Sequence, residues 1–202
     1  MKFLVRPIFL AAALALAGCA SYDTRLTSSS TQYLTSGGQI VSRQSHVGFP
    51  DTVSYWDGDG IAGSPSIVID LREQKALFYK GGRLVGVSMI SSGREGYSTP
   101  SGNFKIIQKN KDHVSNLYGD YVDAAGNVVV ANVGVKSDPM PPGTRFRGAP
   151  MPYFMRIHGG VGMHAGFLPG FPASHGCIRM PAKMAEIFFS NVSQGTPVRV
   201  VN

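Results

Sequence analysis

The sequence lacks a hydrophobic segment long enough to cross a membrane as a helix. An apolar run from Ile8 to Ala17 follows the basic residues Lys2 and Arg6. This run reaches only about half of the roughly 20 residues that a spanning helix needs. Basic residues followed by a short apolar run are typical of a signal segment. The sequence therefore favours export through a removed signal over a permanent transmembrane helix.

The sequence is also poor in cysteine, with only two in 202 residues. The first ends the segment Leu-Ala-Gly-Cys at 16–19, which resembles the lipobox of bacterial lipoproteins. In that family the chain is cut before the Cys, which is then acylated. The resemblance implies a lipoprotein signal peptide at residues 1–18 and a lipidated Cys19, whose acyl chains together would hold the protein on a membrane. The alternative is an ordinary signal peptide with a chance Cys.

The residue after Cys19 bears on which membrane would hold such an anchor. In the lipoprotein family an Asp at this position favours retention in the inner membrane, whereas this sequence has Ala20. We therefore expect a cell-envelope protein that is lipid-anchored in the periplasm, with the outer membrane favoured over the inner.

Acidic residues are scarce as well. The chain has 12 Asp+Glu against 19 Lys+Arg, for a formal net charge of +7, and it stays basic after loss of Lys2 and Arg6. A basic exported domain is suited to anionic envelope polymers or lipid headgroups. Nucleic acid is excluded as a partner, since an exported protein does not meet it.

If Cys19 is lipidated, Cys177 has no partner for a disulfide. A single thiol in an exported protein is a liability unless its reactivity is used. The competing interpretation is that Cys177 is simply a small buried apolar residue.

The chain divides by composition into a tether and one folded domain. Residues 19–63 comprise the lipidated Cys and a stretch rich in Ser, Thr, Gln and Gly, without sustained apolar periodicity, as in a flexible linker. Asp-Gly-Asp-Gly at 57–60 lacks the later Glu of a calcium loop and is interpreted as a turn near the domain entrance. Residues 64–202 form a domain of ordinary size.

Short β-rich runs separated by Gly and Pro fill this domain. Strands are predicted at 66–71, 75–80, 83–90, 104–107, 128–130 and 198–201, with Gly81-Gly82 as a two-residue hairpin turn. One helix is predicted from Ala182 to Val192, where apolar residues recur at helical spacing after Pro181. The pattern predicts a mainly β, sandwich-like fold with one or two short helices.

The densest chemistry lies between Arg156 and Arg179, which contains three of the five histidines and Cys177. A zinc site would use His158, His164, His175 and Cys177, but these ligands lack the paired short spacing usual for structural zinc. A Cys–His nucleophile is favoured instead. A free Cys has a pKa near 8.5, so only about 3% is thiolate at pH 7, and a neighbouring imidazole removes that limit. Gly176 allows a sharp turn that can aim backbone amides at a developing oxyanion.

The segment Ser-His-Gly-Cys-Ile-Arg at 174–179 resembles the signature of the L,D-transpeptidase catalytic domain (YkuD-type). The similarity extends to Ser-Gly at 92–93 with Tyr-Ser-Thr-Pro-Ser-Gly-Asn-Phe at 97–104, and to Met-Pro-Tyr-Phe at 151–154. Shorter matches occur at 115–119 and 195–198. The resemblance covers about residues 64–201. It implies an L,D-transpeptidase-type β-sandwich.

The resemblance assigns a role to each catalytic position. Cys177 matches the acylated nucleophile, His164 the general base, and the Ala165 carbonyl the group that orients the imidazole. The amides of Gly176 and Cys177 are expected to contribute to an oxyanion hole.

The remaining motif positions are assigned to the substrate. Arg179 is expected to support the loop or bind a substrate carboxylate. Ser174 and His175 are also expected to line the substrate site, with the His175 ring ordering the loop. His158 flanks a predicted turn at Gly159-Gly160, about 10 Å along the chain from His164 at roughly 3.3 Å per residue. Its contribution stays open.

The resemblance implies a two-step acyl transfer on peptidoglycan stem peptides, without metal or organic cofactor. Cys177 would attack an L-centre carbonyl, release the terminal D-residue and form a thioester. A second stem or a protein amine would then resolve the thioester, forming a cross-link or attaching the protein to the wall. Two other hypotheses stay open, namely an L,D-hydrolase with water as acceptor and a non-catalytic peptidoglycan-binding lipoprotein.

Overall fold

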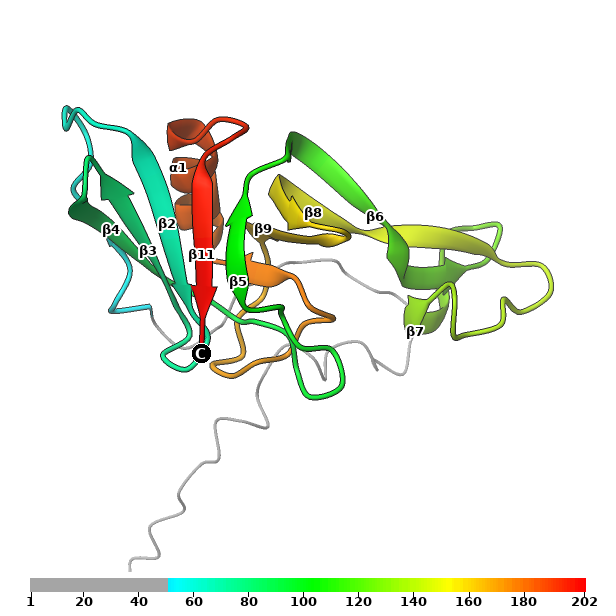
Figure 1. Cartoon of the computed structure of the whole chain (residues 1–202). Helices are drawn as coiled ribbons and strands as arrows, with labels where there is room; N and C mark the ends of the chain where they lie inside the picture. The colour runs from blue at the N-terminus through cyan, green and yellow to red at the C-terminus, as the bar shows by residue number, and fades with distance from the viewer. Residues whose placement is uncertain (1–50) are drawn as a thin grey trace, which may run out of the picture.

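The computed structural model describes residues 51–202 (Figure 1). The predicted signal peptide, Cys19 and most of the predicted tether lie outside the described residues. Within the part that is described, no helix has the length and apolar character needed to cross a membrane.

Two β-sheets make up most of the fold. The first has six strands in the order β1-β4-β3-β2-β11-β5, and the second has five in the order β10-β9-β8-β6-β7. The strands of the first sheet are β1 (Tyr55–Trp56), β2 (Pro65–Asp70), β3 (Lys75–Lys80), β4 (Arg83–Met89), β5 (Gly102–Lys105) and β11 (Pro197–Val201). Those of the second are β6 (Gln108–Val122), β7 (Val128–Gly134), β8 (Arg145–His158), β9 (Val161–Ala165) and β10 (Ile178–Met180).

Alternation of apolar side chains explains the first sheet. In β2 and β3 every second residue is buried, among them Ile67, Ile69, Ala76 and Phe78, each at most 1% exposed, as expected for strands with one face on the core. The β3–β4 hairpin closes through Gly81 and Gly82, whose φ angles are +57° and +83°. A two-residue turn of this kind requires positive φ at both positions.

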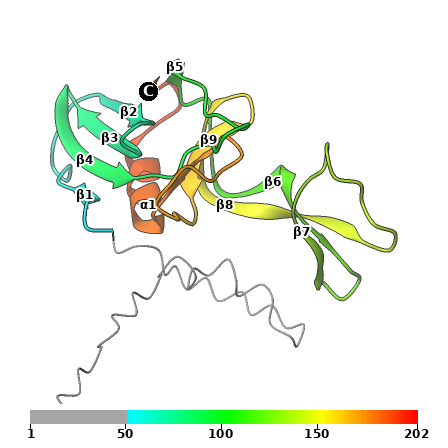
Figure 2. The same cartoon turned by 90° about the horizontal axis from the view of Figure 1, so that it is seen from below.

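One helix, α1 (Ala182–Asn191), packs between the two sheets. It contacts β8 and β9 of the second sheet, and its Phe188 ring meets Phe78 of β3 edge-on at 4.9 Å between centroids. Figure 2 shows α1 enclosed between these strands. Phe188 is fully buried, so the helix joins the two sheets into one core. The predicted mainly β, sandwich-like fold with a single helix near the C-terminus is confirmed.

The fold extends to residues before the predicted domain start at 64. Strand β1 pairs with β4, and the Trp56 ring packs edge-on against Phe78 at 5.1 Å between centroids. The Lys80 ammonium lies 5.3 Å from the centre of the Trp56 ring. A two-residue strand is too short to show a periodic pattern, which is why composition alone placed these residues in the tether.

The sequence also missed the longest strand. β6 spans 15 residues that are mostly polar, so it has little of the apolar alternation that predicts a strand. It pairs with β8 along most of its length and with β7 near its end. In Figures 1 and 2 the far ends of β6 and β8 project with β7 as an arm away from the body of the molecule.

Replacing the buried Phe188 tests the role of α1. Phe188→Ala removes the ring that contacts both Phe78 and Trp56, and we expect a loss of about 3–5 kcal/mol in the free energy of unfolding, as for other large core truncations. Urea unfolding followed by circular dichroism measures it. Lys183→Ala on the exposed face of α1 is the matched control, expected to change stability by less than about 0.5 kcal/mol. Equal losses in both variants would contradict the packing described.

Candidate active site

Parallel pairing of β10 with β9 brings the two central motif residues together. Arg179 lies opposite His164, and Ile178 lies opposite Met163. Successive side chains of a strand point to opposite faces, so Met163 and Ile178 enter the core while His164 and Arg179 face the other side. Cys177 immediately precedes β10. The pairing therefore brings the loop of the predicted nucleophile next to the strand that carries the predicted base.

Ser174 shapes the turn that presents Cys177. This side chain is 2% exposed; its hydroxyl donates to the Cys177 carbonyl and accepts from the Gly176 amide at 3.0 Å. Gly176 has a φ of +107°, a conformation that side-chain-bearing residues rarely adopt. Ser174 thus supports the loop from inside, and its place in the substrate site stays a prediction.

A second segment, residues 91–99, ties this turn to the rest of the protein. Ser91 exchanges two backbone hydrogen bonds of 3.0 Å with Arg179, and Gly93 bridges to Ser174. The buried Thr99 hydroxyl donates to the Gly176 carbonyl at 2.8 Å and accepts from the Gly93 amide at 2.9 Å. A side chain at Gly93 would collide with backbone at 2.0 Å. The loop is therefore braced on both sides of Cys177.

His164 has the hydrogen bonding expected of a general base. Its Nδ1 lies 2.8 Å from the Ala165 carbonyl oxygen, which can only accept, so Nδ1 carries the proton and Nε2 keeps its lone pair. The side chain is 5% exposed. Its pKa is lowered to about 4, chiefly by burial and also by the positive charge of Arg179, despite the opposing effect of the Ala165 hydrogen bond. The imidazole is neutral at pH 7.

His175 is held in a different way. Arg94 donates to its Nε2 at 2.8 Å, so this nitrogen has no free lone pair for proton abstraction. The ring stacks on Tyr118 of β6 at 4.2 Å between centroids and meets Tyr97 edge-on at 4.7 Å. Burial, and then Arg94, lower the pKa of His175. The ring therefore orders the loop, linking it to the arm and to the 91–99 segment.

The Cys177 thiol lies at a half-buried position. Its Sγ is 3.6 Å from the Gly160 carbonyl, to which the S–H donates. Burial raises the pKa of the thiol, while a hydrogen bond from the Gly162 backbone and the charges of Arg179 and Arg156 oppose that rise. At rest, therefore, both the thiol and the His164 imidazole are neutral.

The residues of the alternative zinc site do not assemble. His158 lies on the exposed side of the Gly159-Gly160 turn, where its ring packs on Phe104 at 5.4 Å between centroids. Within residues 51–202, no three His, Cys, Asp or Glu side chains are close enough together to hold a metal ion. Whether His158 contributes to the reaction stays open.

The structure adds two residues of β8 to the site. The Phe154 ring lies where a side chain at Gly162 would stand, at 2.6 Å, and the Arg156 guanidinium lies 5.0 Å from the centre of that ring. Both share the face of His164. The sequence contained a signal for them, since they alternate with the core residues Met155 and Ile157. Only the strand pairing shows that this outer face of β8 is the one that continues into the face of His164.

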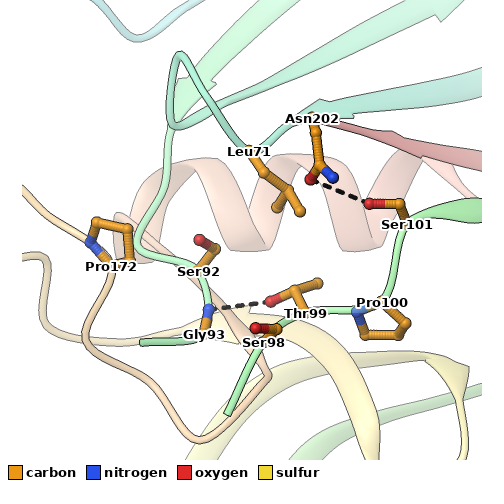
Figure 3. A pocket seen from close by; sticks show the side chains of 9 residues that line it. All are labelled: Leu71, Ser92, Gly93, Ser98, Thr99, Pro100, Ser101, Pro172 and Asn202. Atoms are coloured by element: carbon orange, nitrogen blue, oxygen red, sulfur yellow. Dashed lines mark hydrogen bonds between the residues drawn. The ribbon is translucent and has the colours of Figure 1, made fainter. Parts of the chain in front are cut away.

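A cleft of about 460 Å³ lies beside the 91–99 segment (Figure 3). It is rich in hydroxyl groups, and its walls are Leu71, Ser92, Gly93, Ser98, Thr99, Pro100, Ser101, Pro172 and Asn202. Cys177 is not among them. Two hydrogen bonds visible in Figure 3, Gly93–Thr99 and Ser101–Asn202, shape its walls. Gly93 and Thr99, which brace the Cys177 loop, therefore also line this cleft.

Comparison with known proteins identifies the family of this domain. The family model of the L,D-transpeptidase catalytic domain matches residues 64–200. A comparison with curated proteins gave no significant match. Among solved structures, an L,D-transpeptidase from Mycobacterium smegmatis is 20% identical with a TM-score of 0.53, over 69% of this chain and 59% of that one.

Two further solved structures are similar. A mutant of the Enterococcus faecium L,D-transpeptidase is 26% identical with a TM-score of 0.50, over 69% of this chain and 50% of that one. The L,D-transpeptidase LdtMt1 in complex with imipenem is 20% identical with a TM-score of 0.53, over 68% and 59%. The match thus spans less than two thirds of each of these relatives. The family model matches residues 64–200, which is more than half of the sequence and includes His164 and Cys177. The chain therefore belongs to the L,D-transpeptidase catalytic domain family.

Proposed function

We propose that this protein is a cysteine-dependent L,D-transpeptidase that acts on peptidoglycan stem peptides through a thioester. The observation that carries the proposal is the hydrogen bond of His164 Nδ1 to the Ala165 carbonyl, on the strand that pairs with β10, which begins directly after Cys177. It fixes the tautomer whose Nε2 can accept a proton, as the third member of a catalytic triad does.

The first half of the reaction forms the acyl-enzyme. As Sγ of Cys177 bonds to the carbonyl carbon of the L-centre residue, the thiol proton passes to Nε2 of His164. The C–N bond to the terminal D-residue then breaks, and that proton goes to the departing amine. Because both resting groups are neutral, the proton moves during the attack, as in general-base catalysis.

Backbone donors near Sγ can stabilise the oxyanion that forms in this step. The Gly176 amide, which the sequence assigned to this task, already donates to Ser174 Oγ. The Cys177 amide has no hydrogen-bond acceptor within residues 51–202, so it is the better candidate donor. In enzymes from which one such donor has been removed, the activation free energy rises by about 3 kcal/mol.

The second half transfers the acyl group to an amine. A second stem or a protein amine attacks the thioester, loses a proton to Nε2 of His164, and displaces the thiol, which recovers the proton. The product is a cross-link or a protein attached to the wall. We further propose that the protein works in the periplasm, anchored through Cys19 to the outer membrane, because a lipid anchor would keep it beside its polymer.

Replacing the nucleophile tests the chemistry directly. Cys177→Ser should lose essentially all turnover and keep the wild-type melting temperature, because a hydroxyl is far less acidic than a thiol and a neutral imidazole does not activate it as well. The measurement is mass analysis of products from tetrapeptide-containing muropeptides, with and without an added amine.

The products also separate the hypotheses. An amine adduct identifies a transferase, and release of the D-residue without an adduct identifies a hydrolase. Substantial turnover by Cys177→Ser would rule out the thioester mechanism.

The neutral His164 predicts a pH-dependent stability. Its pKa is 6.5 when exposed and about 4 in the folded protein, so the folded state binds fewer protons between these values. The stabilisation is complete above pH 6.5 and is lost as the pH falls toward 4. We expect this group alone to lower the free energy of unfolding by about 2 kcal/mol between pH 7 and pH 5. Urea unfolding of wild type and His164→Gln at both pH values measures it. If the variant and the wild type lose the same free energy of unfolding between pH 7 and pH 5, His164 is not buried in its neutral form.

Reaction with β-lactams provides an independent test of the thiol. LdtMt1 was solved in complex with imipenem, and the family resemblance predicts that carbapenems acylate Cys177 here. Intact-protein mass spectrometry should show one adduct on the wild type and none on Cys177→Ala. An adduct on another residue, or none on folded wild type, would count against Cys177 as the nucleophile.

A further inference from the structure

The peptide unit that joins Gly176 to Cys177 has one group held by the protein and one group free. Its carbonyl oxygen, from Gly176, accepts a hydrogen bond from the Thr99 hydroxyl at 2.8 Å. Its N–H group, from Cys177, has no hydrogen-bond acceptor within residues 51–202. The amide nitrogen is joined to Sγ through Cα and Cβ alone, so it lies close to any carbonyl that the thiol attacks. This N–H group is the better candidate donor to the oxyanion.

Thr99 fixes the direction of that N–H group. A peptide unit is planar, and in the trans form its C=O and N–H bonds point in opposite directions. No peptide bond in the described part of the chain is cis. Because the Thr99 hydroxyl lies on the carbonyl side, the Cys177 N–H points away from Thr99. The plane cannot turn over without breaking the hydrogen bond from Thr99 to Gly176.

A different side chain holds the two neighbouring peptide units. Ser174 Oγ accepts from the Gly176 N–H at 3.0 Å and donates to the Cys177 carbonyl. Among the hydrogen bonds of residues 51–202, only the one from Thr99 holds the unit between them. Gly176 makes this anchor necessary, because its φ is +107° and a residue without Cβ turns readily between backbone conformations.

Thr99 is itself rigidly placed. The side chain is 4% exposed, and its hydroxyl accepts from the Gly93 amide at 2.9 Å, which leaves the hydroxyl proton for the Gly176 carbonyl. Pro100 follows and restricts the Thr99 backbone to extended conformations, while the β-branched side chain has few χ1 rotamers. An added Cβ at Gly93 would lie 3.0 Å from the Gly176 Cα, so the two segments are tightly packed.

The same hydrogen bond strengthens the Cys177 amide as a donor. A proton donor on a peptide carbonyl draws electron density toward the oxygen, which makes the N–H of that unit more positive. Such cooperativity amounts to about 10–30% per hydrogen bond in condensed phases. A donor that is aimed in advance also needs no rearrangement when negative charge develops on the substrate.

We propose that Thr99 is a positioning residue of the reaction, which acts through the Gly176–Cys177 peptide unit to aim the Cys177 amide at the oxyanion. This inference rests on the proposed function, since it concerns attack of the thiol on a carbonyl. As Sγ bonds to the carbonyl carbon, the π electron pair moves to the oxygen, where the Cys177 N–H stabilises it. When the C–N bond breaks, the pair returns and the carbonyl forms again as the thioester.

Two reactions of the same thiol separate this role from general support of the loop. Acylation of Cys177 by a carbapenem passes through an oxyanion, whereas alkylation by iodoacetamide displaces iodide from a saturated carbon and forms none. Besides burial, the groups that shift the pKa of the thiol are Gly162, Arg179 and Arg156. Thr99 is not among them, so alkylation should not depend on its hydroxyl. Intact-protein mass spectrometry of the full chain measures both rate constants.

Thr99→Val removes the hydroxyl and keeps the branched shape of the side chain. We expect acylation to slow by at least about tenfold, which is less than the roughly 100- to 1000-fold that follows outright loss of an oxyanion donor. The rate of alkylation should stay close to that of the wild type. Thr99→Ser keeps the hydroxyl with a freer χ1 angle, so it should recover most of the acylation rate.

Ser101→Ala is the matched control. It removes a hydroxyl of a neighbouring residue that donates to Asn202 Oδ1 at 3.0 Å and has no hydrogen bond to the Cys177 loop, so both rates should be kept. Melting temperatures show whether each variant is folded. If Thr99→Val fails to fold, Thr99→Ala compared with Thr99→Ser gives the same contrast.

The outcomes distinguish failure of this inference from failure of the proposed function. Equal acylation of wild type and Thr99→Val would overturn the role of Thr99 and leave the nucleophile intact. A parallel fall of acylation and alkylation would also overturn it, because Thr99 would then only hold the loop in place. A wild type that iodoacetamide alkylates at Cys177 and no carbapenem acylates would refute the proposed function, and the role of Thr99 with it.

Discussion

The site depends on the parallel pairing of two short strands, β9 and β10. Parallel neighbours need a connection that crosses over, and here the connection is the loop that carries Ser174, Gly176 and Cys177. The pairing sets Arg179 opposite His164, and Cys177 lies directly before the paired strand. A shift of one residue in this register would turn His164 into the core and remove the base.

The loop in this crossover would be unrestrained without residues 91–99. That segment leaves the first sheet after β4 and runs beside the nucleophile turn, where Ser91 pairs with Arg179 and Thr99 holds the Gly176 carbonyl. Its hydrogen bonds connect the two sheets at the one place where a precise backbone is needed. Tyr118 adds a contact from the arm by stacking on His175, so both sheets and the arm fix the orientation of the loop.

Electrostatics gives the two histidines of the site different tasks. The Nδ1 proton of His164 goes to a backbone carbonyl, which leaves Nε2 basic, whereas His175 Nε2 accepts from Arg94 and is unavailable. Burial keeps His164 neutral, and the nearby arginines favour negative charge on the thiol. A neutral imidazole with a free Nε2 is suited to accept a proton, as the proposed mechanism requires.

The sequence by itself determined the candidate nucleophile, the family motif and most strands, because these leave local signals. Alternation and Gly81-Gly82 predicted β2 to β4, the apolar spacing after Pro181 predicted α1, and a lone Cys177 after Gly176 indicated reactivity. Local patterns could not show β1, which is too short, or the polar strand β6. Only the tertiary structure decided which histidine keeps a free lone pair, that Ser174 supports the loop from inside, and that Arg156 of β8 lies beside the thiol. These facts depend on contacts between segments far apart in the chain, and strand register and burial set them, not the identity of neighbouring residues.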